Sequence, residues 1–180
     1  MRRSGFTLIE VLLVIAIIVL LASLAVPAME GFIAKGNDLK CQQNLRNLFV
    51  MISAAAVDNE NRYPKIEIDV EKPAHSGDPS AKPLLETLNP YGCTEKNLEC
   101  PADLAGPNWN KTKKTSYMWQ PMVEDELTNA VTVYMPRGAF PGQLNRLRLL
   151  QDWDLVHNPA QVGMRKRMHV LYADGQVKPR

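Results

Sequence analysis

The sequence predicts an α+β fold, in which one long N-terminal helix packs on a small antiparallel sheet. Three observations predict it. An apolar run and then an amphipathic stripe at helical spacing fill residues 6–57, and short β-prone segments fill the last third. An Asp-Gly turn at Asp174–Gly175 joins two of these segments and is the strongest hairpin signal in the chain. The 180 residues suffice for one domain of ordinary size.

The first half of the predicted helix is apolar all round. The nineteen residues from Val11 to Met29 carry no charge, and only Ser23 and Pro27 interrupt the aliphatic run. Such a run is long enough to cross roughly 30 Å of hydrocarbon as a helix. Glu10 lies at its start, although a carboxylate within a bilayer helix costs on the order of 2.5–3.5 kcal/mol by insertion scales. Glu10 therefore needs a partner and is a candidate functional residue.

The second half of the predicted helix has one apolar face, which we interpret as a packing surface for a sheet. It extends to about Val57, where the turn formers of "DNENRYP" end it. A helix from Phe6 to Val57 would be about 75 Å long at roughly 1.5 Å per residue. The stripe consists of Met29, Phe32, Ile33, Leu39, Leu45, Leu48, Phe49, Ile52 and Ala56.

The remaining chain predicts a long connection followed by strands. Residues 58–114 are rich in Pro, Asn, Asp, Lys and Gly, with one short helix expected at 80–88. The composition of residues 115–120 and 130–135 is typical of strands, and a weaker strand is expected at 148–152. Two further β-prone runs, 168–173 and 176–178, flank the Asp-Gly turn.

Three interpretations of the N-terminal segment compete. A cleaved secretory signal would use the small residues near Ala25 as its cleavage site, which gives a secreted soluble domain. A plain signal anchor would keep Arg2 and Arg3 in the cytoplasm by the positive-inside tendency, but it leaves Glu10 without a reason.

The third interpretation accounts for every residue of "SGFTLIE" at Ser4–Glu10. This motif resembles the class III signal of type IV prepilins and of the pseudopilins of type II secretion. The resemblance implies that prepilin peptidase cuts after Gly5 and methylates Phe6. It also implies that Glu10 is the glutamate of the assembly motif and that Pro27 is the helix-kinking proline. In a filament, Glu10 of one subunit would face the Phe6 amine of a neighbour, and this pairing would set the axial register.

The head also resembles a pseudopilin-like subgroup with a C-terminal His-x9-Asp-Gly element. The ordered motifs are "CQQNLRNL" at Cys41–Leu48, "NRYP" at Asn61–Pro64, "CPAD" at Cys100–Asp103, "TSYMW" at Thr115–Trp119 and "VLYADGQV" at Val170–Val177. The element is degenerate here, because Met164 stands where the subgroup has its histidine, and Gln176 follows the Asp-Gly. No role of that histidine carries over.

Charge and cysteine usage constrain the head. Removal of residues 1–5 takes away two of 21 basic residues and leaves 19 against 19 acidic ones, which gives no support for nucleic-acid binding. The basic run at 165–167 is expected to be a solvated turn or strand end. Of three cysteines, Cys93 and Cys100 are close enough in sequence for a local disulfide. That pair is favoured slightly over Cys41–Cys100, and both stay open.

A metal site in the head is the alternative that the residues leave open. Asp152, Asp154, His157 and Asp174 are ligand types for hard or borderline metals, whereas the simpler interpretation puts Asp154 at a loop start and Asp174 in the turn. Some pseudopilins bind calcium near the C-terminal sheet, so the resemblance leaves calcium open. A membrane-anchored periplasmic enzyme or metal-binding protein using Asp152, Asp154 and His157 is the corresponding rival function.

The resemblance implies a structural subunit of a pseudopilus or pilus, and not an enzyme. We expect a leader at 1–5, a transmembrane and assembly helix at 6–29, its amphipathic half at 30–58, and a periplasmic head at 59–180. The subunit would cross the inner membrane once, with its N-terminus cytoplasmic. Its expected partners are prepilin peptidase, copies of itself or other pseudopilins, the inner-membrane assembly platform and the lipid bilayer. No cofactor is required.

Overall fold

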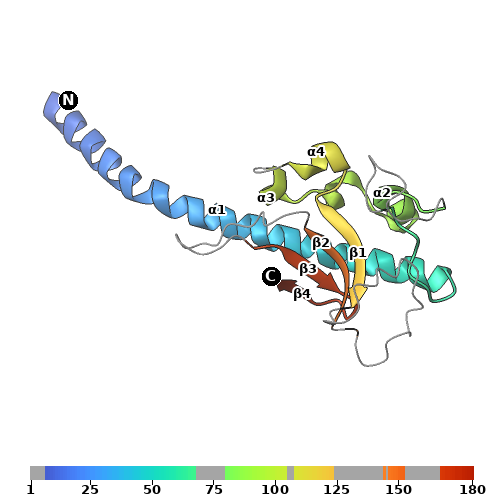
Figure 1. The fold of residues 1–180 in the computed structure, drawn as a ribbon. Coiled ribbons are helices and arrows are strands. Elements are labelled where there is room, and N and C mark those ends of the chain that lie inside the picture. The colour runs from blue at the N-terminus through green and yellow to red at the C-terminus, as the bar shows by residue number, and fades with distance from the viewer. Residues whose placement is uncertain (1–6, 68–79, 105–107, 124–143, 145, 153–166) are drawn as a thin grey trace, which may run out of the picture.

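The computed structural model describes residues 7–67, 80–104, 108–123, 144, 146–152 and 167–180. Within them, one long helix precedes several short helices and then a sheet, which confirms the predicted α+β class (Figure 1). The elements are α1 (Leu8–Asp58), α2 (Leu84–Leu88), η1 (Asn89–Tyr91), η2 (Glu95–Leu98), α3 (Pro101–Leu104), α4 (Trp109–Lys113), β1 (Tyr117–Val123), β2 (Leu147–Asp152), β3 (His169–Tyr172) and β4 (Val177–Pro179).

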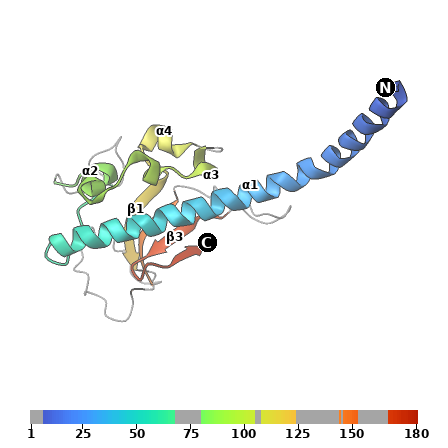
Figure 2. The ribbon, with the colours of Figure 1, turned by 180° about the vertical axis from the view of Figure 1, so that it is seen from behind.

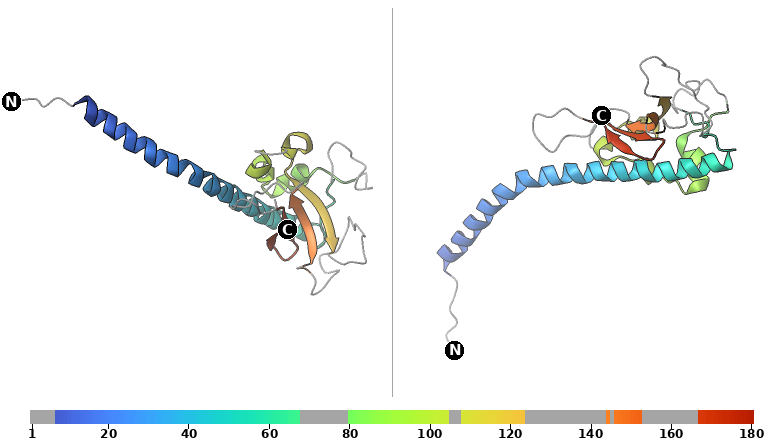
Figure 3. Two further views of the ribbon diagram at one scale, coloured as in Figure 1. Left: turned by 60° about the vertical axis from the view of Figure 1, so that its left-hand side comes forward. Right: turned by 90° about the horizontal axis from the view of Figure 1, so that it is seen from below.

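Helix α1 has two parts with different surroundings. Its N-terminal part projects away from the head, and its C-terminal part lies against the sheet and the short helices (Figures 1 and 2). Figure 3 shows the helix curving along the projecting part. Two local features favour such curvature. The Ser23 hydroxyl donates to the Leu20 carbonyl at 2.8 Å, and Pro27 lacks the N–H for an intrahelical bond.

The sheet is antiparallel throughout, with strand order β1-β2-β3-β4. The predicted Asp-Gly turn is confirmed between β3 and β4. Gly175 has a φ of 82°, in the left-handed region, and the Asp174 carboxylate accepts from the Gln176 N–H at 2.9 Å. A Cβ at Gly175 would lie 2.9 Å from Phe49 Cε1 of α1, so the turn also packs tightly on the helix.

The core lies between the C-terminal part of α1 and the sheet. Five α1 residues at three- and four-residue spacing have no exposed surface, and Trp119 meets Tyr63 edge-on with ring centroids 6.4 Å apart. The five residues are Cys41, Leu45, Leu48, Ile52 and Ala56. The later part of the predicted stripe, from Leu45 to Ala56, is therefore the packing face of the helix. Its earlier members, Met29, Phe32, Ile33 and Leu39, are between 57% and 76% exposed and do not belong to that face.

Three details differ from the expectations. The short helix expected at 80–88 starts only at Leu84, because Pro83 occupies the N-cap. The connection at 58–114 contains η1, η2, α3 and α4, which are too short to show a helical period. Strand β1 is shifted from 115–120 to 117–123. The strand expected at 130–135 lies outside the described residues.

The cysteine pairing also needs correction. Cys41 and Cys100 form a disulfide with Cα atoms 5.0 Å apart, whereas Cys93 is a buried free thiol. The slight preference for Cys93–Cys100 was wrong, because Cys41 belongs to the buried stripe of α1 and Cys100 is packed against it at the start of α3. Burial raises the pKa of the Cys93 thiol to about 11.

We expect Cys100→Ala to lower the free energy of unfolding by about 4 kcal/mol, because the disulfide closes a loop spanning 59 residues. Cys93→Ala should cost only about 1 kcal/mol, through lost packing. Thermal unfolding of the full chain in detergent, followed by near-ultraviolet circular dichroism, would compare them. Non-reducing peptide mapping that found Cys93 in the crosslink would contradict this pairing.

Candidate functional site

The described part of α1 begins with a capping box. Thr7 is the N-cap, and Glu10 is the third residue of the helix. The Thr7 backbone N–H and hydroxyl both donate to Glu10 Oε2 at 2.8 Å, and the Glu10 N–H donates to the Thr7 hydroxyl at 3.4 Å. Reciprocal bonds of this kind satisfy donors that a helix start otherwise leaves unpaired. The carboxylate of Glu10 is therefore bound within its own first turn.

Sequence reasoning missed this capping box, although its Thr-x-x-Glu signal was readable at Thr7–Glu10. Gly5 and Phe6, the candidate cleavage and methylation positions, lie outside the described residues. Pro27 lies inside α1, whose backbone stays helical on both sides of it. Of the four N-terminal candidates, Glu10 is thus the one whose contacts the structure describes.

The projecting part of α1 exposes an apolar surface on all sides. From Leu8 to Leu21, its large aliphatic side chains are between 50% and 84% exposed. A helix that is apolar all round is ordinarily buried in lipid or among other helices. Judged from the described residues alone, no helix has the length and apolar character that a membrane crossing requires.

Of the four head candidates for a metal site, the structure describes Asp152 and Asp174. Asp154 and His157 lie outside the described residues. Asp174 makes the turn, as the simpler interpretation expected. Among the described residues, no three His, Cys, Asp or Glu side chains are grouped so as to hold a metal ion.

The buried carboxylate of Asp152 has a structural partner instead. Its Oδ2 accepts from the His169 backbone N–H at 2.6 Å and lies 3.6 Å from His169 Nδ1. On the other edge of the imidazole, Nε2 lies 3.1 Å from Asp38 Oδ1 of α1. The His169 side chain, 1% exposed, therefore bridges β2 and α1 through two carboxylates. Nothing in the sequence pairs residues this far apart, so sequence reasoning missed the bridge.

A second buried carboxylate, Asp103, organises the connection before β1. Its two oxygens accept from the backbone N–H groups of Trp109 and Asn110 at 2.9 and 3.1 Å. The Ser116 hydroxyl also donates to it at 2.7 Å. Asp103 and Ser116 belong to the "CPAD" and "TSYMW" motifs, so these motifs serve the packing of the head.

Parts of this chain are similar to a known family model and to known proteins. Residues 1–26 match the family model described as the prokaryotic N-terminal methylation motif. The chain is 40% identical over 82 residues to "Type II secretion system core protein G" of Aeromonas hydrophila, a match covering 43% of this chain and 57% of that protein. It is 39% identical over 66 residues to the protein of the same name from Pectobacterium carotovorum subsp. carotovorum, covering 37% of this chain and 42% of that protein.

The chain thus spans about half the length of the curated relatives it matches. No solved structure matches it. The match to the methylation motif agrees with the predicted resemblance of residues 1–26 to prepilin signals. The likeness to core protein G supports the predicted resemblance to the pseudopilins of type II secretion.

We expect Asp152→Ala to destabilise the head by about 3 kcal/mol, because it removes one partner of a buried pair and leaves His169 without it. Asp174→Ala, which removes only a turn contact at the surface, should cost about 1 kcal/mol. Urea unfolding of the full chain would measure both. Equal costs would show that the buried bridge contributes no more than the turn.

Proposed function

We propose that this chain is a structural subunit of a type II secretion pseudopilus or of a type IV pilus-like filament. The observation that carries the proposal is the capping box at Thr7 and Glu10, which lies directly after the candidate cleavage position at the start of an exposed apolar helix. The subunit would catalyse nothing and would itself be the substrate of prepilin peptidase. The methylation motif and the likeness to core protein G support this proposal.

Processing would give the helix a charged end. Cleavage after Gly5 would create a new amine at Phe6, which methylation leaves basic. That amine would stand one residue before the N-cap Thr7, close to the first turn that binds Glu10. Within one chain, a cation at a helix N-terminus opposes the helix dipole, and Glu10 offsets it. Processing therefore supplies the cation that a carboxylate in an apolar setting needs.

Assembly would use the Glu10 carboxylate oxygen that accepts no hydrogen bond from Thr7. Both bonds from Thr7 end on Oε2 of Glu10, so Oε1 keeps its lone pairs for the amine of a neighbouring subunit. Apolar helices have few features that define their axial position. One ion pair between subunits would define it, because a misplaced neighbour would leave a charge unpaired in an apolar environment.

The same proposal implies where the subunit lies and which partners it contacts. The apolar part of α1 would lie in the inner membrane before assembly and among neighbouring helices afterwards, with the head periplasmic. Its partners would be prepilin peptidase, the inner-membrane assembly platform and other pseudopilins. The proposed boundaries are a leader at 1–5, an assembly helix at 6–29, its amphipathic half at 30–58 and a head at 59–180.

Mass spectrometry of the chain co-expressed with a prepilin peptidase should find a mature N-terminus at N-methyl-Phe6. Gly5→Val should retain the leader, because a branched side chain replaces the small residue at the cut. Ser4→Ala is the matched control and should be processed normally. A mature N-terminus at Val26 would support a secreted domain, and an intact Met1 would support a simple anchor, so either outcome contradicts the proposal.

Glu10→Gln should reduce filament assembly by more than about tenfold while leaving cleavage intact, because it removes the charge and keeps the shape. Thr7→Val should have a smaller effect, since the backbone N–H still reaches Glu10. Glu95→Gln, an exposed change in the first turn of η2, is the control. Sheared-filament yields would be measured in cells carrying the assembly system. Normal assembly of processed Glu10→Gln would refute this role of the carboxylate.

A further inference from the structure

We propose that the end of the head nearest the projecting part of α1 is a binding surface for anionic phospholipid headgroups. We call this surface the proximal rim and define it by Phe32, Lys35, Arg167 and Arg180. The inference rests on the proposed insertion of α1 in a bilayer. It assigns to the head a lipid contact that is distinct from the anchoring by the apolar helix.

The sheet lies alongside α1, so that residues distant in sequence stand at the same position along the helix axis, here called their level. His169, at the start of β3, touches Asp38, and Gly175, beyond its end, packs on Phe49. Strand β3 therefore runs alongside α1 in the same direction. Arg167 precedes His169 by two residues, or about 7 Å at roughly 3.3 Å per strand residue. That distance equals four to five helical residues, so Arg167 lies near the level of residues 33–34.

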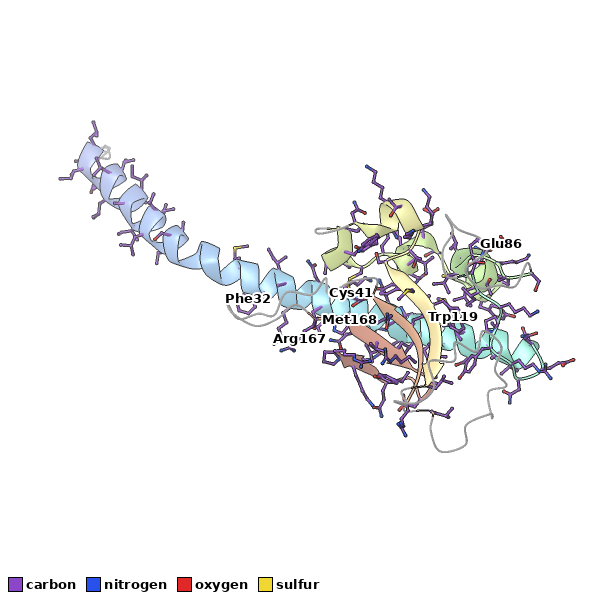
Figure 4. The ribbon with its side chains drawn as sticks, viewed as in Figure 1. Phe32, Cys41, Glu86, Trp119, Arg167 and Met168 are labelled. Atoms are coloured by element: carbon purple, nitrogen blue, oxygen red, sulfur yellow. A yellow bond between two sulfur atoms is a disulfide. The ribbon has the colours of Figure 1, made fainter. Side chains whose placement is uncertain are left out.

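The last strand brings the C-terminal residue to the same level. The backbones of Met168 and Arg180 exchange two hydrogen bonds, of 3.1 and 2.8 Å. Figure 4 shows Phe32, Arg167 and Met168 at the end of the head from which α1 projects. Three parts of the chain, far apart in sequence, thus contribute to the proximal rim.

The net charge at this level is positive. Residues 30–40, 167–170 and 177–180 contain five basic residues against two acidic residues, Glu30 and Asp38. Asp38 is already engaged by His169 and by the Gln42 amide at 2.9 Å. The side chains of Lys35, Arg167 and Arg180 are exposed. Just behind them, the Lys178 ammonium lies 4.7 Å from the centre of the Tyr172 ring, and Lys40 is exposed on α1.

Apolar side chains accompany these charges. Phe32 is 76% exposed, and Ile33 and Leu39 are each 57% exposed. Aromatic and aliphatic groups next to lysine and arginine are typical of surfaces that lie at the boundary between headgroups and acyl chains. Charge alone would also suit other polyanions. The exposed apolar groups, continuous with the apolar helix, favour a lipid surface.

The distances also suit a bilayer. The apolar run ends at Met29, and Lys35 follows six residues later, about 9 Å along the helix. The headgroup region extends roughly 5–8 Å beyond the hydrocarbon on each side, and charges act over a screening length of about 8 Å. The proximal rim therefore stands where phosphate groups would be, and each basic residue there favours anionic lipid by about fivefold.

The test uses the full chain reconstituted in phosphatidylcholine vesicles containing phosphatidylglycerol. Electron paramagnetic resonance of spin-labelled lipids measures which of the two lipids associates with the protein. We expect a several-fold preference for phosphatidylglycerol that falls as salt is raised. The rim variant Lys35→Glu/Arg167→Glu/Arg180→Glu should lose all of this preference except the part that Arg2 and Arg3 contribute. Arg2 and Arg3 are present in every sample, so their own attraction for anionic lipid does not distinguish the variants.

The matched control is Arg46→Glu/Arg62→Glu/Lys96→Glu, which makes the same charge change at exposed positions further along the head and should keep the preference. A glutamine version of the rim variant replaces the glutamate version if circular dichroism shows misfolding. An inserted chain with no lipid preference, a preference insensitive to salt, or a rim variant that keeps it would overturn the inference. A chain that alkaline extraction removes from the vesicles would instead refute membrane insertion, and with it both proposals.

Discussion

The structure depends on one helix that has to suit two surroundings along its length. Over Leu8–Leu21, α1 is apolar all round, and over Cys41–Ile52 it has a single buried face. The transition requires a polar sector to appear on the helix without a break in its backbone. Because the sheet packs on that one face, the register of the stripe sets where β3 meets α1. The bridge from Asp38 to His169 and the close contact of Gly175 with Phe49 both follow from it.

This dependence explains which parts of the fold were predictable. Hydrophobic periodicity marks α1, because a continuous helix repeats its pattern over many turns. The Asp-Gly turn is equally local, since Gly175 adopts a left-handed conformation that few residues tolerate. Apart from α2, which lies within the helix expected at 80–88, the short helices after α1 were not predictable. Their three to five residues span about one turn, and they are held by buried partners such as Asp103.

The candidate sites likewise divide into those that the sequence could predict and those that it could not. The signal around Glu10 is contiguous in sequence, so the resemblance identified it, and its capping box with Thr7 could have been found from spacing alone. The disulfide and the His169 bridge join residues separated by 59 and by more than a hundred positions. Sequence spacing favoured the nearer partner, Cys93. Packing decided otherwise, because Cys41 lies on the buried stripe and Cys100 is held against it.

The disulfide between Cys41 and Cys100 has a mechanical consequence. It is the covalent crosslink between α1 and the part of the head that follows it. An axial force on α1 reaches the disulfide at Cys41 three residues after the contact between Asp38 and His169, and before most of the buried stripe. The load then passes through a covalent bond, and the apolar contacts beyond it are shielded from shear. A subunit moved by its helix would thus carry its head along as one rigid piece.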